Sequence, residues 1–214
     1  MRQKPRRLKK GDTIGIISPS GPFRDEKMTR ALLFLEKLGL NYKLGKNARN
    51  CWGYLAGKDE ERLADLHDMF ADPHIAGIIC SRGGYGAARF TDKINFELIR
   101  NNPKVFWGYS DITFLHTAIG QLANLVTFHG PMLSSDIAGD DFAELSASMF
   151  NQLFEPTTLT YDESISELEV LSEGTVKAEI IGGNLSLLTN SIGTKFEIET
   201  SGKILLIEDI GEEP

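Results

Sequence analysis

The sequence predicts an α/β fold built on a mostly parallel sheet that is flanked by helices. Short, continuously apolar runs recur along the first part of the chain, and each is followed by a segment with apolar residues at helical spacing. Runs without polar alternation are typical of strands that are buried on both faces. The alternation of such strands with amphipathic helices indicates βαβ units, and ligands bind such sheets at the carboxyl ends of the strands.

The predicted elements follow one another through the first part of the chain. The first strand ends sharply at Pro19, and Gly39 suits the end of the helix that follows. The strands are predicted at residues 13–18, 75–80, 105–108 and 125–129. The helices are predicted from apolar faces made of Met28, Ala31, Leu32, Leu35 and Leu38, of Leu63, Leu66, Met69 and Phe70, of Phe90, Ile94 and Leu98, of Ile112, Leu115, Ile119 and Leu122, and of Phe142, Leu145, Met149 and Leu153.

The chain changes character after Pro156. Residues 157–174 are polar and acidic, which indicates a linker between two domains. We therefore interpret residues 1–156 as an N-terminal domain and residues 175–214 as the beginning of a second, smaller α/β domain.

The C-terminal residues predict one βαβ unit. A strand is expected over residues 176–181, a helix opens at Gly182-Gly183-Asn184, and a buried strand covers residues 204–207. A single unit of this size cannot close a hydrophobic core by itself, so we expect this domain to be incomplete.

Composition and charge narrow the class of function. The chain is 41% hydrophobic and 25% charged, as in an ordinary globular protein, and its formal net charge of −7 argues against a nucleic-acid partner. No apolar run approaches the roughly 18 residues that cross a membrane, and the start lacks the apolar core of a secretory signal. Cys51 and Cys80 are too few for a disulfide framework or a zinc site, so we expect reduced, buried thiols in a cytoplasmic protein.

The turn after the strand at 105–108 carries Ser110, the candidate nucleophile. A serine on a tight strand-to-helix turn exposes its hydroxyl beside the unpaired first N–H groups of the helix. Such a nucleophile elbow has strained backbone dihedrals, which we expect at Ser110. Ile112 stands where the usual pattern has glycine, and an ordinary helix N-cap is the alternative interpretation of Ser110.

The loop Gly83-Gly84-Tyr85-Gly86 has two chemical interpretations. It could bind a dinucleotide, but the third glycine of that fingerprint is replaced by Arg89, whose bulk opposes close helix–strand packing. Alternatively, the glycines bring backbone N–H groups to a substrate carbonyl, and the N–H of Asp111 completes an oxyanion hole. A tight turn that needs positive φ is compatible with both interpretations.

Three unusual turns fall at the carboxyl ends of predicted parallel strands. They are Pro19-Ser20-Gly21-Pro22, the glycine loop and the Ser110 turn. Because these ends meet at one edge of a parallel sheet, we expect the three turns to line one crevice.

Glu208 is the candidate acid. It ends an apolar strand, where a carboxylate is held rigidly and partly desolvated, and it could orient a histidine as the acid of a serine triad does. The alternative is that Glu208 and Asp209 only begin a polar turn.

None of the histidines is an obvious base for Ser110. His67 and His74 are predicted at the surface or at helix ends, and His116 should point along its helix, away from the serine turn. His129 follows a strand end, where it could line the crevice or serve as a buried, hydrogen-bonded structural residue.

Six motifs, taken in order, resemble the LD-carboxypeptidase (murein tetrapeptide carboxypeptidase) family over nearly the whole chain. They are Gly11-Asp12-Thr13-Ile14-Gly15-Ile16-Ile17-Ser18-Pro19-Ser20-Gly21-Pro22, Ser81-Arg82-Gly83-Gly84-Tyr85-Gly86, Gly108-Tyr109-Ser110-Asp111-Ile112-Thr113, His129-Gly130-Pro131, Gly182-Gly183-Asn184-Leu185 and Leu206-Ile207-Glu208-Asp209. The resemblance implies a Rossmann-like N-terminal domain that bears the nucleophile and a C-terminal domain with the other triad members.

The resemblance also assigns roles to the site residues. Ser110 matches the nucleophile and Glu208 the acid, while the N–H groups of Asp111 and of the Gly83–Gly84 loop would hold the oxyanion. Neither a metal nor a cofactor is implied. No histidine follows His129, whereas the family's catalytic histidine lies in a later continuation, so we expect a fragment with almost no turnover of its own.

The implied activity is that of a cytoplasmic, homodimeric serine carboxypeptidase that releases D-alanine from murein tetrapeptide during peptidoglycan recycling. The microcin C self-immunity branch is the alternative within the family; its members cleave a peptidyl-nucleotide and stack the nucleobase on aromatic residues, including a tryptophan. Here the tryptophans are Trp52 and Trp107, and residues 156–183 hold a single aromatic, Tyr161, which favours the cell-wall substrate. A non-catalytic ligand-binding or dinucleotide-binding domain is the alternative from another class.

Overall fold

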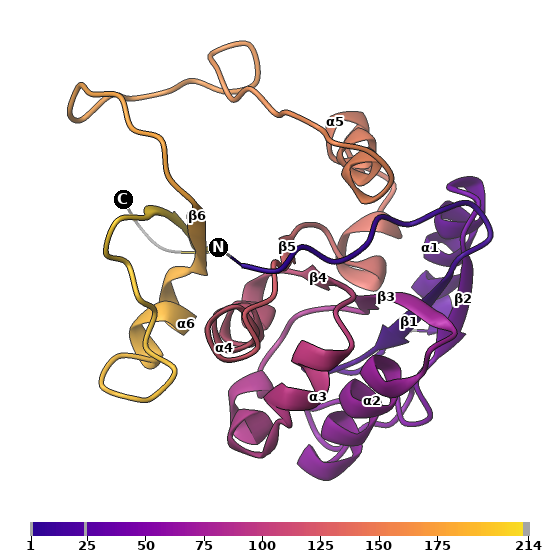
Figure 1. Cartoon of the computed structure of the whole chain (residues 1–214). Coiled ribbons are helices and arrows are strands. Elements are labelled where there is room, and N and C mark those ends of the chain that lie inside the picture. Colours follow the sequence, from indigo (N-terminus) through magenta and orange to yellow (C-terminus); the bar gives the residue numbers. More distant parts are fainter. Residues whose placement is uncertain (1, 24, 212–214) are drawn as a thin grey trace.

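The computed structural model describes residues 2–23 and 25–211, and it confirms the predicted α/β fold (Figure 1). Within these residues one parallel sheet has the order β2-β1-β3-β4-β5, and β6 and β7 form a separate parallel pair. The strands are β1 (Thr13–Ile17), β2 (Asn41–Leu44), β3 (Ile75–Cys80), β4 (Val105–Gly108), β5 (Phe128–His129), β6 (Ile180–Asn184) and β7 (Ile204–Glu208).

The helices alternate with the strands as the periodicity predicts, but β2 is not among the predicted strands, because this edge strand is mostly exposed and lacks a continuous apolar run. The helices are α1 (Asp25–Lys37), α2 (Asp59–Ala71), α3 (Phe96–Asn101), α4 (Thr113–Leu122), α5 (Glu144–Ser148) and α6 (Leu185–Asn190). Shorter helical turns cover Ala87–Lys93, Ser110–Ile112, Leu133–Ile137 and Met149–Leu153. No helix among the described residues is long and apolar enough to cross a membrane.

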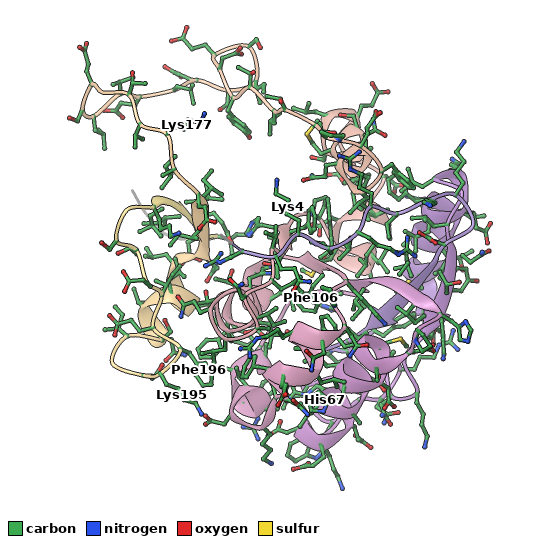
Figure 2. All side chains as sticks on the ribbon, viewed as in Figure 1. Lys4, His67, Phe106, Lys177, Lys195 and Phe196 are labelled. Carbon is green, nitrogen blue, oxygen red and sulfur yellow. The ribbon has the colours of Figure 1, made fainter. Side chains whose placement is uncertain are left out.

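The five-stranded sheet lies between two layers of apolar side chains. One layer, contributed by α2, α3 and α4, includes Phe70, Ile99 and Leu115, all of which are fully buried. The opposite layer contains Leu35 of α1 and Phe150. Phe106, which Figure 2 labels inside this part of the molecule, stacks on Phe70 with ring centroids 6.1 Å apart. The continuous apolar character of β3 and β4 therefore reflects burial on both faces.

The helix predicted around Phe90, Ile94 and Leu98 is wrong as a single element. A 3₁₀ helix ends at Lys93, and Ile94 has extended dihedrals (φ −67°, ψ 130°). Asn95 then starts α3, because its side chain accepts a hydrogen bond from the N–H of Leu98. The N-cap chemistry of asparagine outweighs the helical spacing of the apolar residues.

Two other predicted elements are shorter than expected. The strand predicted at 125–129 is reduced to β5, which pairs with Trp107 and Gly108, while Leu125 forms an isolated bridge with Gln3. The helix predicted through Phe142 and Leu153 is split into α5 and a 3₁₀ helix. In both places the backbone is less regular than the pattern suggests, and in the second Leu145 is exposed while Phe150 and Leu153 are buried.

An exposed segment without helices or strands leads to the second sheet. Residues 157–174 contain no helix or strand, and Figure 1 shows them running outside the rest of the chain toward β6. Lys177 projects from the end of this segment (Figure 2). The division at 1–156 and 175–214 nevertheless remains a prediction.

The strand predicted at 176–181 is displaced, because the observed strand β6 begins four residues later, at Ile180, and ends at Asn184. Ile180 is the first residue paired with β7, opposite Ile204, and Val176 is 71% exposed. Gly182 and Gly183 belong to the strand, and α6 begins after Asn184, whose side chain accepts from the N–H of Leu187. The register with β7 fixes the start of β6, and that partner is invisible to local periodicity.

Candidate functional site

Ser110 lies on a strained turn between β4 and α4. Its φ is 61°, a left-handed value that is rare for a residue with a side chain, and Tyr109 before it is extended. Ser110 is half-buried, so its hydroxyl is not sealed in the core. Such strain persists only where the surrounding structure holds it. The predicted strained turn is confirmed, and the helix N-cap alternative is disfavoured because the N-cap residues of the 3₁₀ turn and of α4 are Tyr109 and Ile112, not Ser110.

The glycine loop lies directly against this serine. A Cβ added to Gly83 would stand 3.0 Å from both Cβ and Oγ of Ser110, so a larger residue would collide with the candidate nucleophile. Gly84 has a φ of +131°, and a Cβ there would stand 3.0 Å from the amide nitrogen of Gly21. The N–H of Gly21 in turn donates to the carbonyl oxygen of Gly83 at 3.1 Å. The three turns therefore converge, as predicted.

Glu208 ends β7 opposite Asn184 of β6. Its Oε1 is buried and has no hydrogen-bond partner among the described residues. Burial raises the pKa of Glu208, and the charge of Asp209 raises it further. A buried carboxylate oxygen without a donor is costly, so this atom is a suitable acceptor for an incoming N–H group. Burial and the hydrogen bond to Asp136 raise the pKa of Tyr109, and the charge of Glu208 raises it further.

The C-terminal strand pair approaches the nucleophile turn through α4. A Cβ added to Gly183 would stand 2.4 Å from Oγ1 of Thr113, the first residue of α4. The same hydroxyl oxygen accepts the N–H of Asn184 at 3.0 Å. The absence of a side chain at Gly183 thus lets β6 pack closely on α4, the helix that follows Ser110. Strand β6 also carries Asn184, which lies opposite Glu208.

The histidines do not supply a base for Ser110 in the part of the chain that the structure describes. His116 is buried, and its Nε2–H donates to the carbonyl oxygen of Gly108 at 2.7 Å. The ring therefore points back toward the strand end that precedes Ser110, so the expectation that it points away from the serine turn is wrong. Burial lowers its pKa to about 4, so the ring is neutral. His129 is exposed rather than buried, with its ring 5.7 Å from that of Tyr109, and the buried structural alternative for it is wrong.

The remaining histidines lie elsewhere. His67 accepts the N–H of Asn95 at its Nε2, and His74 is exposed at the end of α2. No hydrogen bond joins either of them to Ser110 in the described residues. The predicted surface position is confirmed for His74, but His67 is half-buried within α2 and not at its end, so the prediction is wrong for His67.

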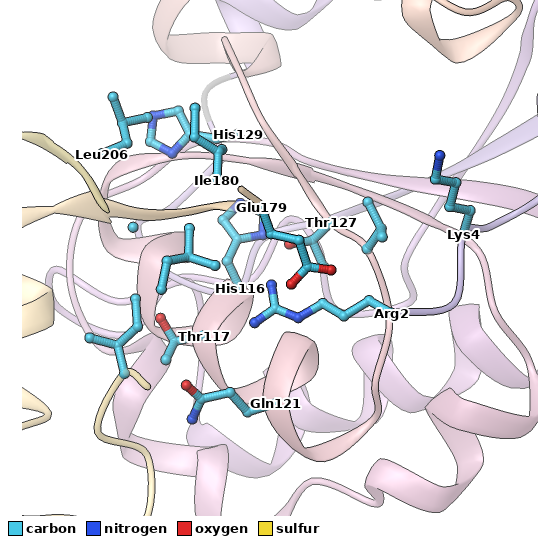
Figure 3. A pocket seen from close by; sticks show the side chains of 14 residues that line it. Arg2, Lys4, His116, Thr117, Gln121, Thr127, His129, Glu179, Ile180 and Leu206 are labelled. Atoms are coloured by element: carbon cyan, nitrogen blue, oxygen red, sulfur yellow. The ribbon is translucent and has the colours of Figure 1, made fainter. Parts of the chain in front are cut away.

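A cavity of about 290 Å³ lies beside this region, between α4, β5 and the N-terminal segment on one side and β6–β7 on the other (Figure 3). His116 and His129 line it together with charged residues of its rim, Arg2, Lys4 and Glu179. Ser110 and the glycine loop are not among its lining residues. No group of three or more potential metal-ligating side chains occurs among the described residues. Cys80 is buried as expected, but Cys51 is exposed, so the expectation of two buried thiols is wrong for Cys51.

The guanidinium of Arg62 is a buried polar group that the sequence did not lead us to expect beside the three turns. Arg62 of α2 is only 2% exposed, and its guanidinium donates to the carbonyl oxygens of Pro19 and Gly86. The signal was present, because Arg62 precedes Leu66 by four residues and so shares the inward face of the helix. A charged residue on an apolar face indicates a partner that only the tertiary structure identifies.

The chain matches two sequence families. Residues 14–130 match the family described as the LD-carboxypeptidase N-terminal domain, and residues 177–214 match the LD-carboxypeptidase C-terminal domain. A Bacillus subtilis protein named "Probable murein peptide carboxypeptidase" is 57% identical over 211 residues, which are 99% of this chain and 66% of that protein. This chain therefore spans about two thirds of the length of that relative.

Solved structures share the fold. A crystal structure of an MccF-like protein from Bacillus anthracis has a TM-score of 0.86 and 32% sequence identity, over 97% of this chain and 70% of that one. The microcin C7 self-immunity protein MccF, in complex with aspartyl sulfamoyl adenosine, has a TM-score of 0.82 and 26% identity, over 96% of this chain and 70% of its own.

Proposed function

We propose, on the premise that this chain belongs to the LD-carboxypeptidase family, that it forms the larger part of a serine carboxypeptidase. The substrate is a murein tetrapeptide, and hydrolysis of its L,D-peptide bond releases D-alanine. The printed name of the Bacillus subtilis relative supports the murein substrate. The cytoplasmic location and the homodimer follow from the family resemblance alone, and light scattering on the purified protein tests the dimer.

The observation that carries this proposal is the strained Ser110 turn packed against the glycine loop. Ser110 Oγ attacks the carbonyl carbon of the scissile bond, and its proton passes to a base. The carbonyl oxygen becomes negatively charged and is held by the N–H groups of Asp111 and of the Gly83–Gly84 loop. Collapse of this intermediate, with the proton passed from the base to the leaving nitrogen, expels D-alanine and leaves an acyl group on Ser110, which water then removes.

Glu208 orients the base, which is a histidine other than the four in this sequence. The buried, unpartnered Oε1 of Glu208 supports this role, because it can accept the N–H of an imidazole. A serine hydroxyl without a base keeps only a residual rate, on the order of 10³–10⁴ over water, from binding and the oxyanion hole. The 214-residue chain by itself should therefore show almost no turnover.

The test compares D-alanine release by this chain with release by a chimera that joins it to the part of the Bacillus subtilis relative that it does not span. The chimera should release D-alanine from a murein tetrapeptide, and the Ser110→Ala chimera should not. A Glu208→Gln chimera should lose about 10⁴-fold in kcat, since a neutral side chain no longer stabilises the imidazolium. Robust, Ser110-dependent release by the chain alone would contradict the missing base and would direct attention to His129.

The competing substrate class is a peptidyl-nucleotide, because a structural relative binds aspartyl sulfamoyl adenosine. Tyr161, the aromatic residue in the segment where nucleobase stacking is expected, is 63% exposed and has no ring contact among the described residues. The chimera should therefore bind aspartyl sulfamoyl adenosine weakly in a calorimetric titration. Tight binding without D-alanine release would favour the microcin C alternative.

A further inference from the structure

The side chain of Asp111 has a role that differs from that of its backbone N–H. This carboxylate is only 3% exposed, and a single oxygen, Oδ2, accepts two hydrogen bonds. The hydroxyl of Ser20 donates to it at 2.6 Å, and the N–H of Ala87 donates at 2.9 Å. Ser20 lies in the turn after β1, and Ala87 directly follows the glycine loop. Because Asp111 is next to Ser110, one oxygen atom ties together the three turns of the crevice.

The surroundings of Asp111 are built to hold a carboxylate. Burial raises its pKa, while the hydroxyl of Ser20, the amides of Ala87 and Gly86 and the positive charge of Arg62 all lower it. Arg62 donates to carbonyl oxygens in the same two loops and pairs with Asp59. Removing one partner of such a buried network leaves the other uncompensated, so the loops and the carboxylate hold each other in place.

The fit between the loop and the nucleophile is tight enough for small shifts to matter. The position of a Gly83 Cβ lies 3.0 Å from Ser110 Oγ, so the backbone of the loop already touches the serine side chain. A displacement of about 1 Å between reacting groups costs about 100-fold in rate. The groups that set the spacing between the loop and the serine therefore set the geometry of the site.

We propose that the Asp111 carboxylate is a positioning residue that fixes the glycine loop and the Ser20 turn against the Ser110 turn. It does not touch the substrate; it acts by holding the backbone N–H groups that receive the oxyanion. This inference rests on the proposed function, in which those N–H groups stabilise the intermediate.

Asp65 offers a matched control within the same chain. Its carboxylate is 2% exposed, its pKa is also raised by burial, and it accepts hydrogen bonds from the N–H and the Nδ2 of Asn47. Asp65 lies in α2, and its hydrogen bonds connect that helix to the segment after β2. An Asp65→Asn variant thus perturbs an equally buried carboxylate that has no bond to the Ser110 turn.

The first experiment measures hydrogen exchange of the 83–87 segment in this chain, without substrate. Asp111→Asn replaces the charged acceptor with a neutral amide oxygen, which weakens both hydrogen bonds, so exchange in this segment should be about tenfold faster than in the wild type. In Asp65→Asn exchange there should be unchanged, while the segment around Asn47 exchanges faster. Ser20→Ala keeps the Asp111 carboxylate and removes one of its two donors, so it should accelerate hydrogen exchange of residues 83–87 less than Asp111→Asn does. This variant also tests the inference if Asp111→Asn does not fold.

The second experiment measures turnover in the chimera described above. Asp111→Asn should lower kcat about 100-fold while KM changes less than about threefold, because the oxyanion contact forms only in the transition state. Asp65→Asn should leave both constants within about threefold of the wild type. Equal losses of kcat in the two variants, or unchanged exchange at 83–87 in both Asp111→Asn and Ser20→Ala, would overturn the inference.

The two experiments also separate this inference from the function on which it rests. Faster exchange at 83–87 in Asp111→Asn, with no D-alanine release by the wild-type chimera, would support the positioning role and contradict the proposed activity. Normal release by the wild type with an unchanged kcat in Asp111→Asn would support the activity and contradict the positioning role.

Discussion

The five-stranded sheet and the β6–β7 pair are built from strands of similar apolar sequence but are buried to different extents. Every residue of β3 is buried, whereas Leu205, Leu206 and Ile207 of β7 are 42%, 41% and 50% exposed. The first sheet has helices and loops on both faces, while the pair contacts the rest of the described chain mainly where Gly183 meets α4. An apolar strand indicates a face that needs covering, but it does not reveal what covers it.

The largest expected difference between the two regions is in the cost of truncating an apolar side chain. Phe106→Ala removes a fully buried ring and should lower the free energy of unfolding by about 3–5 kcal/mol. Leu206→Ala removes a side chain that is 41% exposed and should cost about 1 kcal/mol or less. Urea denaturation followed by circular dichroism measures both values. Equal losses would mean that β7 is covered in solution, for example by a second copy of the chain.

The second prediction concerns the loss of folding stability at low pH, which we expect to arise in the region of the five-stranded sheet. Burial, with a smaller effect of His129, lowers the pKa of His116 from 6.5 to about 4. Since the folded-state pKa lies below the unfolded value, the unfolded state binds more protons in this window, and stability falls as the pH falls from 6.5 to 4. The shift corresponds to about 3 kcal/mol.

A His116→Gln variant isolates this contribution. The amide of glutamine can still donate to the carbonyl oxygen of Gly108 but does not titrate, so the loss of stability between pH 6.5 and 4 should be smaller than in the wild type. Urea denaturation at several pH values measures the difference. The same pH dependence in both proteins would show that other groups dominate acid unfolding.

The smallest predicted effect tests the contact between the two regions. Gly183→Ala places a methyl group 2.4 Å from Oγ1 of Thr113 at a φ of +141°, which should cost about 1–3 kcal/mol and loosen β6 from α4. Hydrogen exchange should become faster in β6 and β7 and stay unchanged in β3. Gly193→Ala is the control, because Gly193 also has a positive φ (+78°) but no atom lies within 4 Å of its added Cβ. Equal effects of the two substitutions would mean that backbone strain, not the contact with Thr113, is responsible.

Local patterns predicted most of the first sheet and the candidate nucleophile. Strands β3 and β4 begin and end as expected, because a run of apolar residues bounded by turn residues has few alternatives. The strained turn at Ser110 was also expected, since strand-to-helix turns of this length restrict their dihedrals. The predicted boundaries are wrong where a helix cap or a paired strand sets them, as at the cap residue Asn95 and at the start of β6, which pairs with β7.

The sequence by itself determined the α/β class, the order of most elements except the edge strand β2, and the three turns that meet at the crevice, because these depend on short-range periodicity and on backbone preferences. Only the tertiary structure decided that Gly83 touches Ser110, that Asp111 binds Ser20 and Ala87, and that Glu208 keeps a buried oxygen without a donor. These contacts join residues that are distant in the chain, and their energies depend on burial. Which groups pack against a buried polar atom is decided only when separate elements come together, so no local pattern encodes these contacts.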